Sequence, residues 1–264
     1  MKLLTLNAHS VIDENYDKKI ETFCLAILKH KPDIIALQEV MQPKKAEISS
    51  FFGEIRTLGE IPIKKDNFLL KVFNLLQKHG LNYYATYAGF KKAYDYYDEG
   101  LAILSMKETT SSELIQLSRF NDYENYKTRF ALGVKCDNSW FYSVHFNWEN
   151  EETSPFLYEW SELQNTIKNK NKVFLMGDFN LTPKSNGYEL VSKSYYDTYL
   201  LAKEIDNGIT VKGEIDGWSG KKEDKRIDYI FTNKNTDIKS SYTIFNGKNE
   251  DVVSDHYGVL VEKE

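Results

Sequence analysis

Short apolar runs of strand length recur along this chain, and several of them end in a polar side chain. We assign nine of these runs to strands, because polar or glycine-containing turns bound them. The expected strands are residues 2–7, 33–38, 101–105, 130–136, 140–146, 173–177, 227–232, 242–245 and 257–262. Amphipathic helical patterns lie between them, at residues 16–30, 68–79, 155–170 and 184–203.

The order of these elements favours two face-to-face sheets with helices outside them. Asp137-Asn138 between two strand patterns predicts a tight hairpin turn, and hairpins make neighbouring strands antiparallel. A parallel doubly wound sheet is the alternative. We find no Pro/Gly/Ser-rich linker, low-complexity tract or repeat, so we expect residues 1–264 to form a single domain.

Charge and cysteine usage limit the classes of function. A net charge of −5 argues against a broad basic face, so we expect no stable nucleic-acid complex. Cys24 and Cys136 are expected to be free buried thiols rather than a bridge, which suits a cytoplasmic protein. No secretion signal or membrane-length apolar run is evident, so we expect no membrane association.

Polar residues gather where the expected strands begin or end. The most specific cluster is "GDFN" (177–180), because neither Asp nor Asn favours strands. Each residue alone could cap a turn or helix. If the strands align, however, these side chains meet at one edge of the sandwich. They are Asn7, Glu39, Glu99, His145, Asn147, Asp178, Asn180, Asp228, Asp255 and His256.

The motifs "TLN", "LQE", "EGLAILS", "VHFN", "GDFN", "RIDYIF" and "SDHYGV" occur in this order over nearly the whole chain. Together they resemble the endonuclease/exonuclease/phosphatase (DNase I-like) superfamily, whose members include nucleases, inositol-phosphate phosphatases and sphingomyelinases. The resemblance implies a four-layer α/β/β/α sandwich of two mixed, largely antiparallel sheets. It also implies metal-assisted hydrolysis of a phosphoester by in-line attack of water.

The same resemblance implies a metal site and a water-activating pair. Glu39, Asn7 and Asp255 would hold a divalent cation, usually Mg²⁺, with Mn²⁺ as the alternative. Asp178 would orient or deprotonate the attacking water, and Asn180 would donate to the phosphate. The histidines compete with Asp178 for the role of general base.

Two histidine–carboxylate pairs complete the implied catalytic set. His256 would pair with Asp228 and His145 with Glu99, and each carboxylate would raise the pKa of its imidazole. The resulting imidazolium could donate to the phosphate or to the leaving group. His9, His30 and His79 match no motif and are expected at the surface or at helix ends.

The substrate is expected to be a small phosphomonoester. Residues 83–100 carry six tyrosines, whose rings could stack on a sugar or simply pack within strands. Trp148 and Trp218 could stack in the same way, and Asn147 is expected to contact the substrate. Arg129 could bind phosphate or form a surface ion pair.

The C-terminal stretch "DNGITVKGEIDGWSGKKEDKRIDYIFTN" narrows this resemblance. It is similar to the bacterial maltose 6'-phosphate phosphatases, which implies a disaccharide phosphate as substrate. A DNA nuclease of the same superfamily, in which tyrosines stack on unpaired bases, is the main alternative. A catalytically silent binding module is a further alternative. The sequence does not indicate the oligomeric state.

Overall fold

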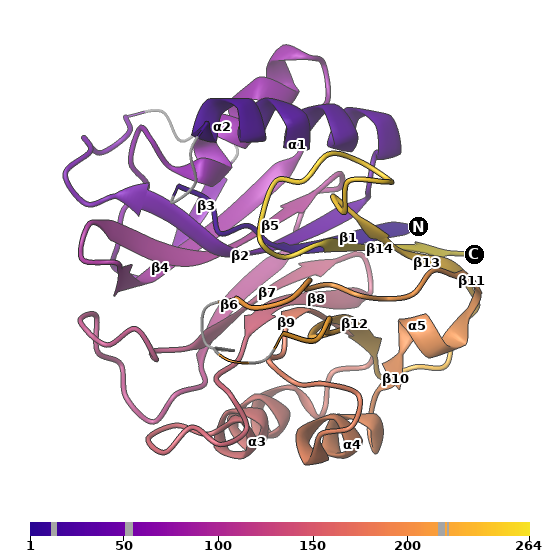
Figure 1. Ribbon diagram of the computed structural model, residues 1–264. Coiled ribbons are helices and arrows are strands. Elements are labelled where there is room, and N and C mark those ends of the chain that lie inside the picture. Colours follow the sequence, from indigo (N-terminus) through magenta and orange to yellow (C-terminus); the bar gives the residue numbers. More distant parts are fainter. Residues whose placement is uncertain (12–14, 51–54, 216–219, 221) are drawn as a thin grey trace.

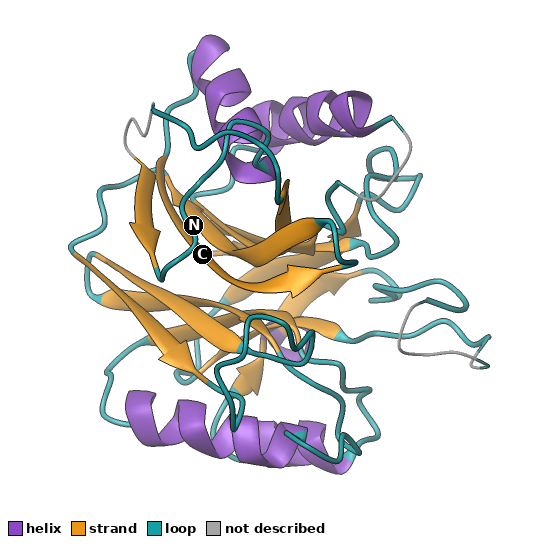
Figure 2. Cartoon of the chain, turned by 90° about the vertical axis from the view of Figure 1, so that its left-hand side faces the viewer, coloured by secondary structure: helices purple, strands orange, loops and turns teal. Residues whose placement is uncertain are grey.

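The computed structural model describes residues 1–11, 15–50, 55–215, 220 and 222–264 of the chain. Two β-sheets pack face to face, and helices cover the outer surface of each sheet (Figure 1, Figure 2). The four-layer α/β/β/α sandwich expected from the sequence is therefore confirmed.

The larger sheet is mixed and has eight strands. In chain order they are β1 (Lys2–Asn7), β2 (Ile34–Pro43), β3 (Ile55–Leu58), β4 (Tyr84–Ala93), β5 (Tyr97–Ser105), β11 (Ala202–Ile205), β13 (Ile238–Ile244) and β14 (Gly258–Lys263). Across the sheet their order is β11-β13-β14-β1-β2-β5-β4-β3. The first strand of the chain is parallel to β2 and antiparallel to the last, β14.

The smaller sheet has six strands. They are β6 (Ser111–Gln116), β7 (Phe130–Cys136), β8 (Ser139–His145), β9 (Val173–Asp178), β10 (Tyr196–Asp197) and β12 (Asp228–Thr232). Across the sheet their order is β10-β12-β9-β8-β7-β6. The expected hairpin joins β7 to β8 through Asp137, whose φ of 50° is the left-handed conformation that a tight turn uses.

Helices form the two outer layers. Figure 1 shows α1 (Tyr16–His30) and α2 (Phe68–Lys78) over the larger sheet, and α3 (Phe156–Ile167) and α4 (Asn186–Ser192) over the smaller one. The short helix α5 (Thr198–Leu201) lies beside β10. Among the described helices, none has the length and apolar character to cross a bilayer.

Three apolar layers separate the four layers of structure. In β9, Phe174 and Met176 pack between the sheets, whereas Val173 and Leu175 pack against the helices of the smaller sheet. Because successive side chains point to opposite faces, a central strand with both faces covered is apolar throughout. This explains why the strand patterns are continuous apolar runs rather than alternating ones.

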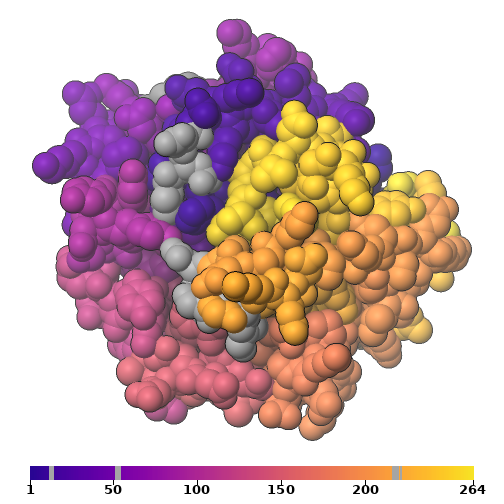
Figure 3. All heavy atoms as spheres, viewed as in Figure 1, coloured from indigo at the N-terminus to yellow at the C-terminus, as the bar shows by residue number. Residues whose placement is uncertain are grey.

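The segments that carry the first and the last polar motif, "TLN" and "SDH", lie side by side. In Figure 3 the yellow C-terminal residues lie against indigo N-terminal ones on the same face. The Ser254 hydroxyl donates to the main-chain oxygen of Asn7 over 2.7 Å. The segment that carries "SDH" is thereby fixed beside the end of β1.

Some element predictions were wrong. The helix expected over 184–203 ends at Ser192, and β10, α5 and β11 follow it. Strand β2 does not end near Gln38 but continues to Pro43. Strands β3, β4, β6, β10 and β11 were not predicted from the sequence. Cys24 and Cys136 are buried free thiols, as predicted.

Candidate active site

Three predicted site residues lie side by side across the smaller sheet. Asp178 at the end of β9 is the partner of His145 in the parallel strand β8 and of Asp228 in the antiparallel strand β12. Gly177 permits this close approach, because a β-carbon there would lie 2.0 Å from the Val144 oxygen, and its φ is 150°. Glycine is therefore required at position 177 by the backbone geometry that places Asp178 beside His145 and Asp228.

Beyond Asp178 the chain turns instead of continuing as a strand. Asn180 has a φ of 51°, its main-chain N–H donates to Asp178 Oδ1 over 2.9 Å, and its amide donates to the Phe146 oxygen. Phe179 turns away into the buried aromatic cluster beneath the sheet. Asp178 and Asn180 nonetheless line the same pocket.

Glu39 reaches the pocket from within β2 rather than from its end. The β2–β5 pairing shifts register between Leu37 and Val40, and Glu39 has a φ of 49°. A bulge of this kind redirects one side chain out of the sheet's alternation, and bulges often occur beside active sites. Glu39 is therefore directed to the site by local irregularity, not by the strand termination that we expected.

Asn7 connects the two sheets at the base of the site. Its Nδ2 donates to Glu39 Oε1 over 2.9 Å and to Asp178 Oδ2 over 3.2 Å. Below it, Gln38 Nε2 donates to Ser143 Oγ of the other sheet over 2.9 Å. These polar links fix the register of the two sheets where the site residues converge.

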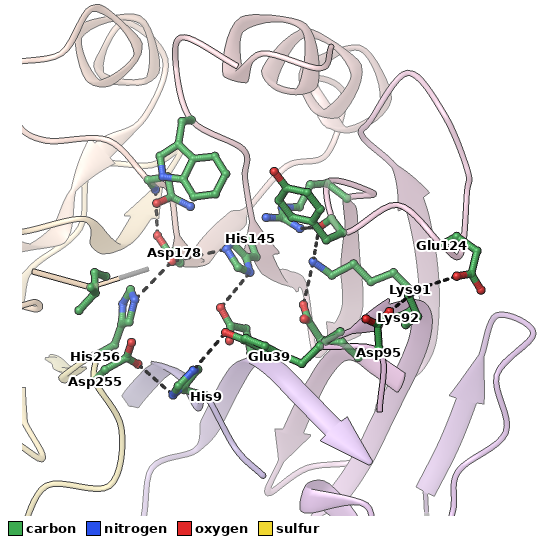
Figure 4. A pocket seen from close by; sticks show the side chains of 18 residues that line it. His9, Glu39, Lys91, Lys92, Asp95, Glu124, His145, Asp178, Asp255 and His256 are labelled. Atoms are coloured by element: carbon green, nitrogen blue, oxygen red, sulfur yellow. Dashed lines mark hydrogen bonds and ion pairs between the residues drawn. The ribbon is translucent and has the colours of Figure 1, made fainter. Parts of the chain in front are cut away.

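A pocket of about 530 Å³ opens over this convergence (Figure 4). Most of the predicted site residues line it: Glu39, Glu99, Arg129, His145, Trp148, Asp178, Asn180, Asp255 and His256. Asn7 and Asp228 do not line it but form hydrogen bonds with Asp178 and His256, which do, and Asn147 does not line it either. Trp218 lies outside the described residues.

The predicted His256–Asp228 pair is present. His256 Nδ1 lies 2.9 Å from Asp228 Oδ2, and its Nε2 lies 3.8 Å from Asp178 Oδ2. Burial alone would lower the pKa of His256, but the charges of Asp228 and Asp178 raise this pKa well above its usual value. His256 is therefore held as an imidazolium.

The predicted His145–Glu99 pair is not formed. Glu99 Oε1 instead lies 3.0 Å from the ammonium of Lys91. The carboxylates near the His145 ring belong to Asp178, at 3.6 Å, and Glu39, at 4.0 Å. Burial and the charges of Arg129 and Lys91 lower the pKa of His145, so it is a neutral imidazole and not the imidazolium that we expected.

Asp178 is a buried carboxyl close to another carboxylate. Burial and the charge of Asp228 raise its pKa to about 7, although His256 and the hydrogen bond from Asn7 oppose the shift. A carboxylate with such a pKa is suited to accept a proton near neutral pH.

We predicted that Asn147 contacts the substrate, but Asn147 does not line the pocket. Its side chain is fully buried, and Nδ2 donates to Glu159 Oε1 over 2.7 Å and to the Lys127 oxygen over 2.8 Å. Its main-chain N–H also donates to Glu159. Asn147 therefore anchors the loop after β8 to α3, because its donors are already used.

Several pocket residues were not predicted. They are His9, Lys91, Lys92, Asp95, Glu124 and Tyr126, whereas Tyr94, which also lines the pocket, is one of the six tyrosines whose rings were expected either to stack on a sugar or to pack within strands. His9, expected at the surface, lies with its Nδ1 3.7 Å from Asp255 Oδ1. In Figure 4 the Lys92–Asp95–Glu124 network lies across the pocket from the acids and imidazoles. The one usable signal was a lysine doublet inside an aromatic strand, which is unusual for a buried element.

The donor set fits a divalent cation. Glu39 and Asp255 both present carboxylates to the pocket, and burial together with Glu99 and Asp255 raises the pKa of Glu39. A divalent cation with oxygen ligands would offset this concentration of negative charge. Asn7 presents its nitrogen to Glu39 in this arrangement, so a half-turn of its amide would be needed to offer oxygen. A second buried group, Asp178, Asp228 and His256, already forms internal hydrogen bonds and ion pairs.

Comparison with known proteins decides the family. Residues 4–256 match the Endonuclease/Exonuclease/phosphatase family. The chain belongs to this family. Its members hydrolyse phosphoesters, so the protein is a phosphoesterase, and family members are typically metal-dependent. A comparison with curated proteins gives no match.

Solved structures agree with this assignment. An endonuclease/exonuclease/phosphatase family protein from Leptotrichia buccalis is 32% identical, with a TM-score of 0.87 over 100% of this chain and 99% of that one. A mannosyl-6-phosphatase from Bacteroides thetaiotaomicron is 16% identical, with a TM-score of 0.66 over 99% and 98%. A 3'-5' exonuclease from Neisseria meningitidis is 17% identical, with a TM-score of 0.66 over 100% of both chains. The last two share the fold.

Proposed function

We propose that this phosphoesterase is a divalent-metal-dependent phosphomonoesterase acting on a small phosphorylated sugar, with maltose 6'-phosphate as the first candidate. The observation that carries the proposal is the charge of the pocket wall. Among the described residues that line the pocket of about 530 Å³, six are acidic (Glu39, Asp95, Glu99, Glu124, Asp178 and Asp255) and three are lysine or arginine (Lys91, Lys92 and Arg129), so acids outnumber bases. Such a wall disfavours a polyanionic strand, whereas carboxylates accept hydrogen bonds from the hydroxyls of an uncharged sugar.

The reaction adds water to phosphorus and breaks the bond between phosphorus and the sugar oxygen, which takes a proton from solvent as it leaves and becomes a hydroxyl. Bound at Glu39 and Asp255, with Asn7 after its amide turns, Mg²⁺ or Mn²⁺ would neutralise phosphate oxygens as charge develops. Asp178 orients the attacking water and accepts its proton. His256, held as imidazolium by Asp228, donates to a phosphate oxygen.

The remaining site residues have supporting roles. His145 acts as a neutral donor beside Asp178, not as the general acid first expected. Asn180, held by its bond to the Phe146 oxygen, contributes to phosphate binding. Glu99 orients Lys91 at the wall of the pocket.

Aromatic side chains at the pocket mouth fit the sugar. Tyr94 and Tyr126 are 47% and 59% exposed although both line the pocket, and Trp148 lines it as well. Exposed aromatic faces beside a polar pocket suit the apolar faces of sugar rings. The nearby Lys92–Asp95–Glu124 network supplies donors and acceptors for hydroxyls.

The named neighbours support two readings. The mannosyl-6-phosphatase suggests a sugar phosphate, and the Neisseria proteins, described as a 3'-5' exonuclease and as a 3' phosphatase bound to a DNA hairpin, suggest DNA. We favour the sugar phosphate because of the acidic wall. DNA hydrolysis is the alternative, in which Tyr94 and Tyr126 would stack on bases.

One assay separates these readings. Purified protein with Mg²⁺ is given maltose 6'-phosphate, an abasic-site duplex or plasmid DNA, and released phosphate and DNA cleavage are measured together. We expect release of phosphate from the sugar and intact DNA, with the reaction stopped by a chelator. Cleavage of DNA without turnover of the sugar phosphate would contradict the proposal.

A further inference from the structure

We propose that Lys91 and Arg129 together form a phosphate-recognition corner that selects phosphomonoesters over phosphodiesters. The inference rests on the proposed phosphomonoesterase function and adds the residues that would give it this selectivity. Lys91 belongs to none of the motifs that carry the family resemblance.

Lys91 is a buried cation in the wall of the pocket. It is 3% exposed, and its ammonium lies 3.0 Å from Glu99 Oε1 and donates to the Tyr126 oxygen over 2.7 Å. An ammonium has three N–H donors, so two are accounted for by these contacts. In Figure 4, Lys91 lies between His145 and the Lys92–Asp95–Glu124 network.

Arg129 lies beside Lys91 and shares one of its acceptors. Its Nη1 donates to the same Tyr126 oxygen over 2.8 Å, and also to the Thr128 oxygen. Its Nε is buried and has no hydrogen-bond partner among the described residues. Within the described residues, the recorded hydrogen bonds of the guanidinium therefore go to main-chain carbonyls and not to a carboxylate. The Arg129 side chain is nevertheless 3% exposed and lines the pocket. A buried charge left in this state is costly unless an anion completes it.

Both cations lie close to the reacting centre. They line the same pocket as Asp178 and His256, and they are the two charges that most strongly lower the pKa of His145. His145 in turn lies 3.6 Å from Asp178. Glu99 forms an ion pair with Lys91, whereas no carboxylate of the described residues forms an ion pair with Arg129, so one cation of the corner lacks a direct partner.

The charge of the substrate explains the expected selectivity. The terminal phosphate of a monoester has three non-bridging oxygens and carries up to two negative charges near neutral pH. A diester has two such oxygens and one charge. The additional oxygen and charge of the monoester are what an excess cation with a free donor recognises. In a diester this position holds an ester oxygen, which accepts hydrogen bonds poorly.

The test compares two substrates with the same leaving group. Lys91→Gln and Arg129→Gln each remove a positive charge and keep a hydrogen-bond donor. With Mg²⁺, kcat/KM is measured for p-nitrophenyl phosphate and for bis(p-nitrophenyl) phosphate. We expect the monoester value to fall by about 10²-fold and the diester value by less than about fivefold, on the scale of losing one charged donor. Inhibition by inorganic phosphate is expected to weaken in parallel.

Lys64→Gln is the matched control. Lys64 is also largely buried, and its ammonium pairs with Asp98 over 2.7 Å. Asp98 precedes Glu99 in the sequence, but Lys64 does not line the pocket. This variant is expected to leave the ratio of monoester to diester kcat/KM unchanged. Circular dichroism and thermal unfolding establish that each variant is folded, and either Lys91→Gln or Arg129→Gln is sufficient for the comparison.

The possible outcomes are distinct. Equal losses on both substrates in a folded Lys91 or Arg129 variant would overturn the selectivity corner and leave the phosphomonoesterase proposal standing. A wild-type enzyme that hydrolyses the diester faster than the monoester would instead contradict the phosphomonoesterase proposal before any variant is made.

Discussion

His256 and His145 both face the carboxylate of Asp178, yet they are held in different charge states. His256 is a charged imidazolium and His145 is a neutral imidazole. His256 has a direct partner in Asp228 at 2.9 Å, and its pKa is raised. His145 is buried near Arg129 and Lys91 instead, and its pKa is lowered. The motif thus specifies the residue type, whereas the surrounding charges determine the protonation state of that residue.

The largest effects are expected at Asp178 and His256. Asp178→Asn and His256→Ala remove the proposed base and the proposed phosphate donor, so each is expected to lower kcat by at least about 10²-fold. Steady-state kinetics on maltose 6'-phosphate measures this loss. Wild-type turnover in either variant would remove that residue from the mechanism.

Replacing each histidine by glutamine tests the comparison itself. Glutamine keeps a neutral donor but cannot carry charge. His145→Gln is therefore expected to lower kcat by less than about tenfold, whereas His256→Gln is expected to cost at least about 10²-fold. Equal losses in the two variants would mean that the two imidazoles have the same charge state in catalysis.

Asp228→Asn is expected to change the pH dependence. In the wild type Asp228 contributes to the raised pKa of His256, so the imidazolium, and with it activity, is lost only as the pH rises through that raised value. Removing the charge lowers this pKa, and the loss of activity moves to lower pH. A profile of kcat/KM against pH with an unchanged alkaline limb would contradict this role.

The smallest expected effect concerns stability near His145. Burial raises the pKa of Glu159 to about 7, above its value in an unfolded chain. Its contribution to stability is therefore fully present below the unfolded pKa and is lost as the pH rises through about 7. Relative to wild type, Glu159→Gln is expected to gain on the order of 1 kcal/mol of unfolding free energy between about pH 4.5 and 7.5. Urea unfolding across this range measures the difference, which a pH-independent result would contradict.

Much of the fold could be predicted because its central strands are continuous apolar runs with clear ends. The weak points have physical causes. The helical pattern over 184–203 continues across Tyr196–Asp197, so it hides the short strand β10. This strand forms because it pairs with β12, and its own two residues carry no strand pattern. Short edge strands such as β3 and β6 carry too few apolar residues to be recognised.

The site shows the same division. Asp178, Asp228 and His256 were found because they follow or open regular strands within specific motifs. Lys91 was missed because the β4–β5 register shifts between Gly89 and Lys91. An irregularity there breaks the two-residue alternation that assigns side chains to a face, and the Lys91-Lys92 doublet was the one local signal of it. Because Lys91 was not predicted to reach the site, Glu99 was assigned to His145 instead of to Lys91.

The most direct test of the account is a nitrogen-15 NMR titration of the histidine rings in the metal-free protein. His256→Ala and His145→Gln would assign the two signals. We predict that the His256 ring stays protonated at pH values well above 6.5, while the His145 ring is already neutral well below 6.5. Two rings that titrate together near 6.5, or in the reverse order, would contradict the claim that their surroundings assign them opposite roles.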